Sequence, residues 1–171
     1  MSILKSKKLY TIILLLTLML IITFMGGFFI NNIKEVAISN NNIEGFTKYS
    51  LRDGRYSISL PKGWEVREDS KDEDLIINFN NESVIYGDIS IVDGELEKFA
   101  ESIDQNKKST KTENNIYIWK VITLEEDGNI DKYYLRNYSE GRVLIIKYSY
   151  KKNKVKNSIK VVFDMISVSF K

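Results

Sequence analysis

The chain has 171 residues, a formal net charge of +2, and no histidine or cysteine. These absences exclude disulfide bonds, a lipid-modified cysteine, nucleophilic triads built on histidine or cysteine, and the zinc, haem and other transition-metal sites that need such ligands. The nine glycines are scattered, and none forms a phosphate-binding loop at a helix start. Candidate chemistry is therefore confined to carboxylates, lysines and hydroxyls.

An uncharged apolar run extends from Leu9 to Ile30. As a helix rising 1.5 Å per residue it would span about 33 Å, enough to cross the hydrocarbon core of a bilayer. Lys5, Lys7 and Lys8 precede the run and no basic excess follows it, so the N-terminus is expected in the cytoplasm and the remainder outside. A cleaved secretory signal is the alternative, although the apolar core of such a signal usually has only about 7 to 15 residues.

Four regions follow from this pattern, and together they predict a single-pass protein of the cell membrane. They are a basic cytoplasmic terminus (1–8), a transmembrane helix (9–30), an Asn-rich irregular linker (31–45) and a folded extracytoplasmic domain (46–171). The length of the last region suits one ordinary domain.

Within the domain, alternation of apolar and polar residues predicts a series of strands, and Asp53-Gly54 predicts a tight hairpin turn between the first two. Helical spacing of apolar residues predicts one helix over 94–108, with Asp93 as its N-cap, and a second over 155–170. The expected fold is α+β, a curved antiparallel sheet of six or seven strands packed with two helices. The expected strands are 47–52, 55–60, 74–80, 83–92, 115–124, 130–139 and 142–150.

The only proline, Pro61, begins the segment Pro-Lys-Gly-Trp. Proline has no amide hydrogen to donate to a strand partner and ends the strand, while Gly63 allows the chain to turn. Trp64 is then expected to fold back into the core, and stacking on a sugar or base is the alternative.

The stretch from Gly54 to Val66, "GRYSISLPKGWEV", resembles the opening of PsbP-like domains, in which an aromatic strand enters a Pro-x-Gly-Trp corner. The later helix, the strand meander and the closing "VSF" are similar as well. The resemblance covers roughly residues 46 to 171 and implies an αβα sandwich, shared with Mog-type Ran-binding proteins, that serves as an extracytoplasmic accessory or binding module. The histidine that some members use near metals is absent here, so that role is not implied.

Six carboxylates cluster in the segment "EVREDSKDED", namely Glu65, Glu68, Asp69, Asp72, Glu73 and Asp74. Carboxylate oxygens at this density could bind a calcium ion, but their spacing lacks the pattern of an EF-hand loop. A solvated acidic loop is the simpler interpretation. A carboxylate-dependent hydrolase would require two acids held about 5 to 10 Å apart across a groove on rigid elements, which a loop does not provide.

Charge is segregated along the chain, because residues 142–171 hold eight basic side chains and one acid, Asp164, whereas residues 31–141 carry a net charge of −8. Lysines and tyrosines alternate in the basic segment, which predicts a contact surface for a protein or an anionic envelope polymer. A solvated turn is the alternative, and nucleic acid is not expected in this compartment. The surface would consist of Lys151, Lys152, Lys154, Lys156, Tyr148 and Tyr150.

These patterns predict a non-catalytic, membrane-anchored binding or accessory domain without a cofactor. A sensory or accessory subunit of a larger membrane complex and, less favourably, a hydrolase remain as alternatives.

Overall fold

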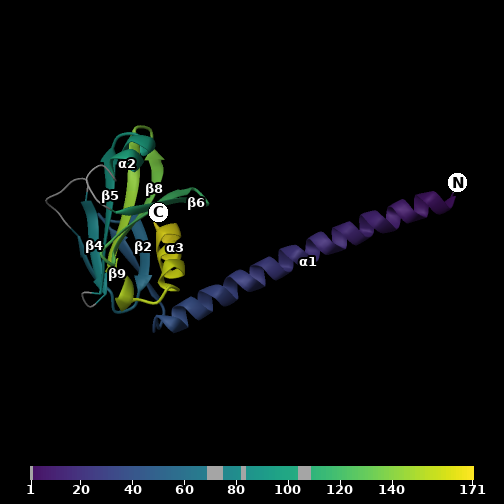
Figure 1. The fold of residues 1–171 in the computed structure, drawn as a ribbon, viewed down its shortest axis with the longest axis horizontal. Coiled ribbons are helices and arrows are strands. Elements are labelled where there is room, and N and C mark those ends of the chain that lie inside the picture. The colour runs from purple at the N-terminus through teal and green to yellow at the C-terminus, as the bar shows by residue number, and fades with distance from the viewer. Residues whose placement is uncertain (1, 69–74, 82–83, 104–108) are drawn as a thin grey trace.

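A long N-terminal helix, α1, projects from a folded domain of strands and shorter helices (Figure 1). The structure is a computed structural model that describes residues 2–68, 75–81, 84–103 and 109–171. The elements are α1 (Ser2–Asn40), β1 (Phe46–Leu51), β2 (Tyr56–Pro61), β3 (Glu65–Glu68), β4 (Leu75–Asn81), β5 (Ile85–Asp93), α2 (Leu96–Ser102), β6 (Thr110–Ile116), β7 (Trp119–Glu126), β8 (Asn129–Ser139), β9 (Arg142–Lys151), the 3-10 helix η1 (Lys152–Lys154) and α3 (Ile159–Ser169).

Seven strands form one sheet in the order β3-β4-β5-β9-β8-β7-β6, and every neighbouring pair is antiparallel. The α+β fold expected from the sequence is thereby confirmed. The hairpin around Asp53-Gly54 also forms, but β1 and β2 make a separate two-stranded sheet instead of extending the large one.

The two faces of the large sheet are covered by different elements. Helix α3 and the β1–β2 hairpin lie on one face, where the larger hydrophobic core contains Ile58 and Phe163. Helix α2 covers part of the opposite face, where Ala100 packs with Ile122 and Leu135. Because successive side chains of a strand point to opposite faces, Tyr134 and its neighbour Leu135 belong to different cores. The arrangement is a sandwich of helix, sheet and helix.

The Pro-Lys-Gly-Trp corner packs as the sequence predicts. Gly63 has a φ of +84°, in the left-handed region that favours glycine, and Trp64 donates its backbone N–H to the carbonyl of Pro61 (3.2 Å). The Trp64 side chain is 6% exposed and stacks on Phe79 with ring centroids 5.8 Å apart. Phe79 in turn covers Gly87, where an added Cβ would lie 2.2 Å from the ring.

The aromatic residues of β9 face the core, which corrects the proposed contact surface. Tyr148 is completely buried and stacks on Phe163 of α3 with a centroid separation of 4.0 Å, and Tyr150 is 7% exposed. The Tyr148 hydroxyl contacts the Ser167 hydroxyl at 2.9 Å. Burial and these contacts show that neither tyrosine belongs to a surface, because the strand period places them opposite the neighbouring lysines.

The expected irregular linker is largely helical. Helix α1 continues without interruption to Asn40, and Ala37 near its end is buried (1% exposed) in the core of the domain. Asn41 then donates its side-chain amide to the Ser158 hydroxyl (3.1 Å). The long helix is thus fixed to the domain by packing and by a hydrogen bond.

Three further elements differ from the expected ones. Strand β3 (Glu65–Glu68) forms where the sequence predicts the start of an acidic loop, so Glu65 and Glu68 lie in the sheet. The expected strand 115–124 is interrupted by a turn at Tyr117 and Ile118 and contributes to both β6 and β7. The expected helix over 94–108 is described only as α2, Leu96–Ser102, and Asp93 ends β5 and pairs with Arg142 (3.2 Å) instead of capping a helix.

Replacing Trp64 by alanine should lower the free energy of unfolding by about 3 to 5 kcal/mol, the usual cost of deleting a large buried aromatic side chain. Urea unfolding of the intact protein in detergent measures this change. Tyr86→Ala is the matched control, because Tyr86 is 53% exposed and should have a much smaller effect. A Trp64→Ala protein of unchanged stability would contradict the packing role of the corner.

Candidate functional site

A large groove lies between α1, α3 and the β6–β7 turn. It has a volume of about 620 Å³. Its α1 wall consists of Ile30, Ile33 and Lys34, and its other walls are mostly apolar. These walls contain Tyr117, Ile118, Trp119, Arg136, Val161, Asp164, Met165 and Val168.

A small group of polar residues lines the floor of this groove. The Arg136 guanidinium lies 4.7 Å from the centre of the Trp119 ring and donates to the carbonyl of Phe170 (3.4 Å). Asp164 accepts a hydrogen bond from the Tyr134 hydroxyl. Burial, followed by the nearby Asp164 carboxylate, raises the pKa of Tyr134, so this phenol stays protonated and remains a donor. The floor is thus fixed by internal contacts, and the walls supply apolar surface.

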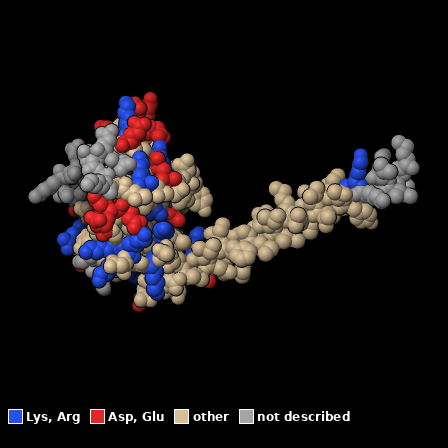
Figure 2. Space-filling model, viewed as in Figure 1, with Lys and Arg blue, Asp and Glu red and all other residues tan. Residues whose placement is uncertain are grey.

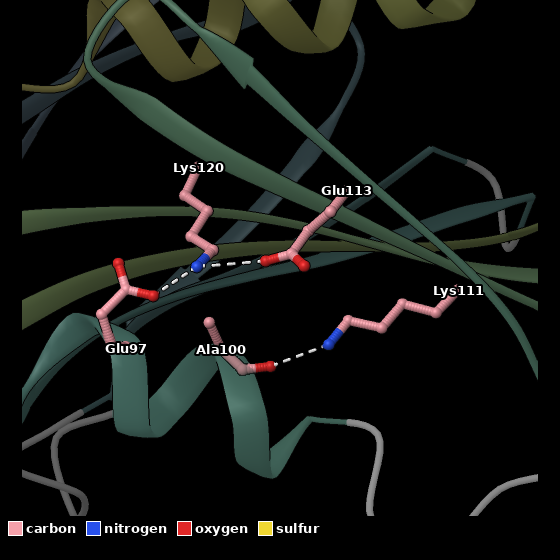
Figure 3. Close-up of polar contacts among 5 residues, drawn as sticks. All are labelled: Glu97, Ala100, Lys111, Glu113 and Lys120. Atoms are coloured by element: carbon pink, nitrogen blue, oxygen red, sulfur yellow. Dashed lines mark hydrogen bonds and ion pairs between the residues drawn. The ribbon is translucent and has the colours of Figure 1, made fainter.

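The β6–β7 hairpin is held against α2 by one lysine on each of its strands (Figure 3). Lys120 lies between two carboxylates, Glu97 of α2 and Glu113 of β6, with 3.1 Å to Glu113. Lys111 donates to the carbonyl of Ala100 (3.3 Å). Hydrogen bonds to Glu97 and then Glu113 raise the pKa of Lys120, so this cation keeps its charge over the physiological range. The hairpin therefore has a defined direction relative to α2.

A second polar cluster lies on the sheet face opposite α3. Lys147 of β9 is 3.6 Å from the Asp131 carboxylate, which also accepts a hydrogen bond from Ser149 (2.6 Å). Asp88 lies nearby on β5, opposite Lys147 in the strand register. Burial raises the pKa of Asp88 despite the attraction of Lys147. The single positive charge of Lys147 offsets one of the two carboxylate charges, as in an ion-pair network that supports the sheet.

The basic residues predicted to form a contact surface lie together at the end of β9 and just beyond it. Lys151, Lys152, Lys154 and Lys156 are all exposed, and Lys152 pairs with Glu125 (2.7 Å). Figure 2 shows lysine and arginine side chains gathered around this end of the domain. Residues 151–156 are called the basic turn. Lys154 and Lys156 line a depression shared with Asn40 and Asn41, so the basic turn is next to the end of α1 that joins the domain.

The predicted acidic loop lies mostly outside the described residues, because residues 69–74 are not described. Its first two acids are described, and Glu65 pairs with Arg67 (3.4 Å) at the edge of the sheet. Across the described part of the chain, no group of three or more acidic side chains is arranged to hold a metal ion. The calcium interpretation of the loop stays untested.

Comparison with known proteins gives matches only among solved structures. No family model matches the chain, and no curated protein matches it in sequence. It is similar to the solution structure of cyanobacterial PsbP from Synechocystis, with 14% identity over 75% of this chain and 93% of that one, at a TM-score of 0.48. It is also similar to a crystal structure from Bacteroides thetaiotaomicron, with 15% identity over 75% of this chain and 48% of that one, at a TM-score of 0.47.

The first of these structures is a PsbP, the family that the Pro-Lys-Gly-Trp corner resembles. Independently of this likeness, α1 contains a stretch long and apolar enough to cross a membrane, with mean hydropathy 2.6. That stretch is compatible with a membrane anchor or with a signal sequence.

Replacing Asp88 by asparagine should change how stability depends on pH. Because the pKa of Asp88 is raised in the folded state, its contribution to stability is fully present below its unfolded pKa of 3.8 and is lost as pH rises through the folded pKa. The Asp88→Asn protein should therefore gain stability relative to wild type as the pH rises above about 4. Urea unfolding at several pH values measures this, with the exposed Glu140→Gln as control. Parallel stability curves for Asp88→Asn and wild type would contradict the burial effect.

Proposed function

We propose that this protein is a single-pass membrane protein whose extracytoplasmic domain binds an anionic protein or envelope polymer and catalyses no reaction. The observation that carries the proposal is the rigid joint between an uncovered apolar helix and a folded domain. Ala37 is buried in the domain core, whereas the large apolar side chains from Leu9 to Ile30 are each at least 47% exposed in the described part of the chain.

The uncovered helix supports a membrane anchor. The described part of the protein buries none of the most apolar window of α1, and Leu14, Met19 and Phe24 are each more than two thirds exposed. Exposing so many large apolar side chains to water is strongly unfavourable, at about 25 cal/mol per Å² of apolar surface. A bilayer removes that cost, and Lys5, Lys7 and Lys8 would hold the N-terminus on the cytoplasmic side.

The position of the basic turn favours a partner that is not the membrane from which the helix emerges. Its neighbour Asn40 follows Ile30 by ten residues, or about 15 Å of helix. The headgroup layer takes up about 5 to 8 Å of that distance, which leaves roughly one Debye length of about 8 Å at physiological salt, so attraction to lipid headgroups is already reduced there. An acidic protein or a wall polymer that extends away from the bilayer can reach the exposed lysines.

Charge pairing among the described acids supports binding in preference to catalysis. Glu97 and Glu113 face one another, which is the arrangement that a carboxylate hydrolase would need, but the ammonium of Lys120 lies between them. Asp131 is likewise paired with Lys147. Neither pair is free to activate a water molecule and protonate a leaving group in turn.

Topology can be tested by adding protease to intact cells. Residues after Ile30 should be digested from outside, whereas a tag placed before Lys5 should stay protected until the membrane is opened. Protection of the domain together with digestion of the tag would reverse the proposed orientation. A mature protein that begins after the apolar stretch would show instead that the helix is a cleaved signal.

Removing the charge of the basic turn should weaken its interaction with polyanions. Substituting Lys151, Lys152, Lys154 and Lys156 by glutamine should weaken binding to wall teichoic acid or polyglutamate by at least about tenfold at low salt, equivalent to about 1.4 kcal/mol. Fluorescence anisotropy with labelled polymer and the intact protein in detergent measures the affinity, and unfolding curves check that the variant is folded.

The matched control carries the same change in net charge elsewhere on the domain, with four exposed lysines replaced by glutamine. It should bind almost as wild type does, because the proposed surface is intact. Equal loss in both variants would indicate a response to net charge alone, and no binding by wild type at low salt would contradict the proposed surface. The control lysines are Lys48, Lys62, Lys98 and Lys171.

A further inference from the structure

The turn between β6 and β7 consists of two exposed apolar residues. Tyr117 is 82% exposed and Ile118 is 67% exposed. Tyr117 also has a φ of +56°, which is uncommon for a residue other than glycine, asparagine or aspartate. Three other hairpin turns contain glycine at positive φ, at Gly54, Gly128 and Gly141. Nothing in the local backbone requires apolar residues at this turn, and asparagine and glycine would suit it better.

The apolar turn lies on the side of the domain from which α1 leaves. Figure 1 shows the β6–β7 hairpin projecting from the domain in the direction taken by the long helix. The same groove is lined by Tyr117 and Ile118 of the turn and by Ile30 and Ile33 of α1. Val168 of α3, which is 57% exposed, extends this apolar surface.

The position of this groove along α1 can be compared with the layers of a bilayer. The apolar stretch of α1 ends at Ile30, and Ile33 lies about 4.5 Å further along the helix. The headgroup layer on each side of the hydrocarbon core is about 5 to 8 Å thick. If the hydrocarbon ends near Ile30, the α1 wall of the groove lies within the headgroup layer. Lys34 on this wall would then meet lipid phosphates.

We propose that the β6–β7 turn, Tyr117 and Ile118, together with Val168, is a second membrane contact that seats the domain on the outer bilayer surface. The inference rests on the proposed membrane anchor and adds a second, peripheral contact to it. Aromatic residues such as tyrosine favour the membrane interface, where the ring meets apolar chains and the hydroxyl remains hydrated. The isoleucine adds apolar area that water would otherwise cover.

Contacts within the protein fix the orientation of the domain relative to α1 and of the β6–β7 hairpin relative to α2. Ala37 packs into the core and Asn41 bonds to Ser158, which orients the domain relative to α1. Lys120 and its two glutamate partners tie the hairpin to α2. Insertion of the turn therefore fixes few additional rotatable bonds, so the loss of conformational entropy on membrane contact is small.

The absence of cysteine from the chain allows this contact to be measured with one fluorophore. Ile118→Cys in the full chain is labelled with an environment-sensitive dye and reconstituted into vesicles of phosphatidylethanolamine and phosphatidylglycerol, with Asn153→Cys in the exposed η1 as matched control. The dye at position 118 should emit at shorter wavelength and be quenched by headgroup nitroxide lipid at least about twofold more strongly than the dye at position 153.

A second variant separates membrane contact from folding. Tyr117→Asn with Ile118→Gly installs the residues that two-residue hairpin turns favour, so the domain should stay folded. In this background a dye at Val168→Cys should lose at least about half of its quenching relative to the same dye with the native turn. Equal quenching with both turns would overturn the role of Tyr117 and Ile118.

Flotation of the same vesicles distinguishes the two proposals. Protein that does not float, or that alkaline carbonate removes from the vesicles, would overturn the membrane anchor and with it this inference. Protein that floats and resists carbonate, but shows equal quenching at positions 118 and 153, would overturn only the second contact. Strong quenching at 118 and weak quenching at 153 would support both.

Discussion

The packing of Ala37 into the domain core is the contact on which the arrangement of this protein depends. It makes the last turns of α1 part of the domain, so the direction in which the apolar helix leaves is set by the same core that holds α3 and the β1–β2 hairpin. A small side chain is needed there, because a residue that is 1% exposed in a close-packed core leaves no room for a larger one. This contact sets the positions of the groove and the basic turn relative to α1.

The core that receives Ala37 combines aromatic packing with a few satisfied polar groups. Tyr148 stacks on Phe163 and meets the Ser167 hydroxyl, and Tyr134 donates to Asp164. Lys132 is 5% exposed, and its ammonium lies 5.0 Å from the centre of the Tyr134 ring. Burial lowers the pKa of Lys132, which the Asp164 carboxylate partly opposes. Buried polar groups with partners of this kind favour one arrangement of α3 over alternatives, since shifting the helix would leave them unpaired.

Local patterns predicted most of the fold, because they carry distinct physical signals. Asp53-Gly54 and the corner around Trp64 depend on residues with special backbone freedom, and the period of α3 is clear. The β6–β7 turn was missed because Tyr117 and Ile118 favour strands and no glycine marks the turn. The helical end of α1 was hidden by asparagines, although the spacing of Ile33 and Ala37 fits a helix. In "KYSYK" the alternation of lysine with tyrosine already places the two types on opposite faces, so Tyr148 and Tyr150 could have been assigned to the core.

Helix α1 runs from the apolar stretch into the core without a hinge, and this continuity would allow several anchored copies to bind one polyanion together. Each anchored copy would present its basic turn at the same height and with the same orientation, so a long polyanion above the membrane could engage several copies along its length. Once one copy is bound, the next binding event is effectively intramolecular, and modest single-site affinity can give strong overall avidity. A flexible tether would spread the same lysines over many heights and reduce the effective concentration of each next site.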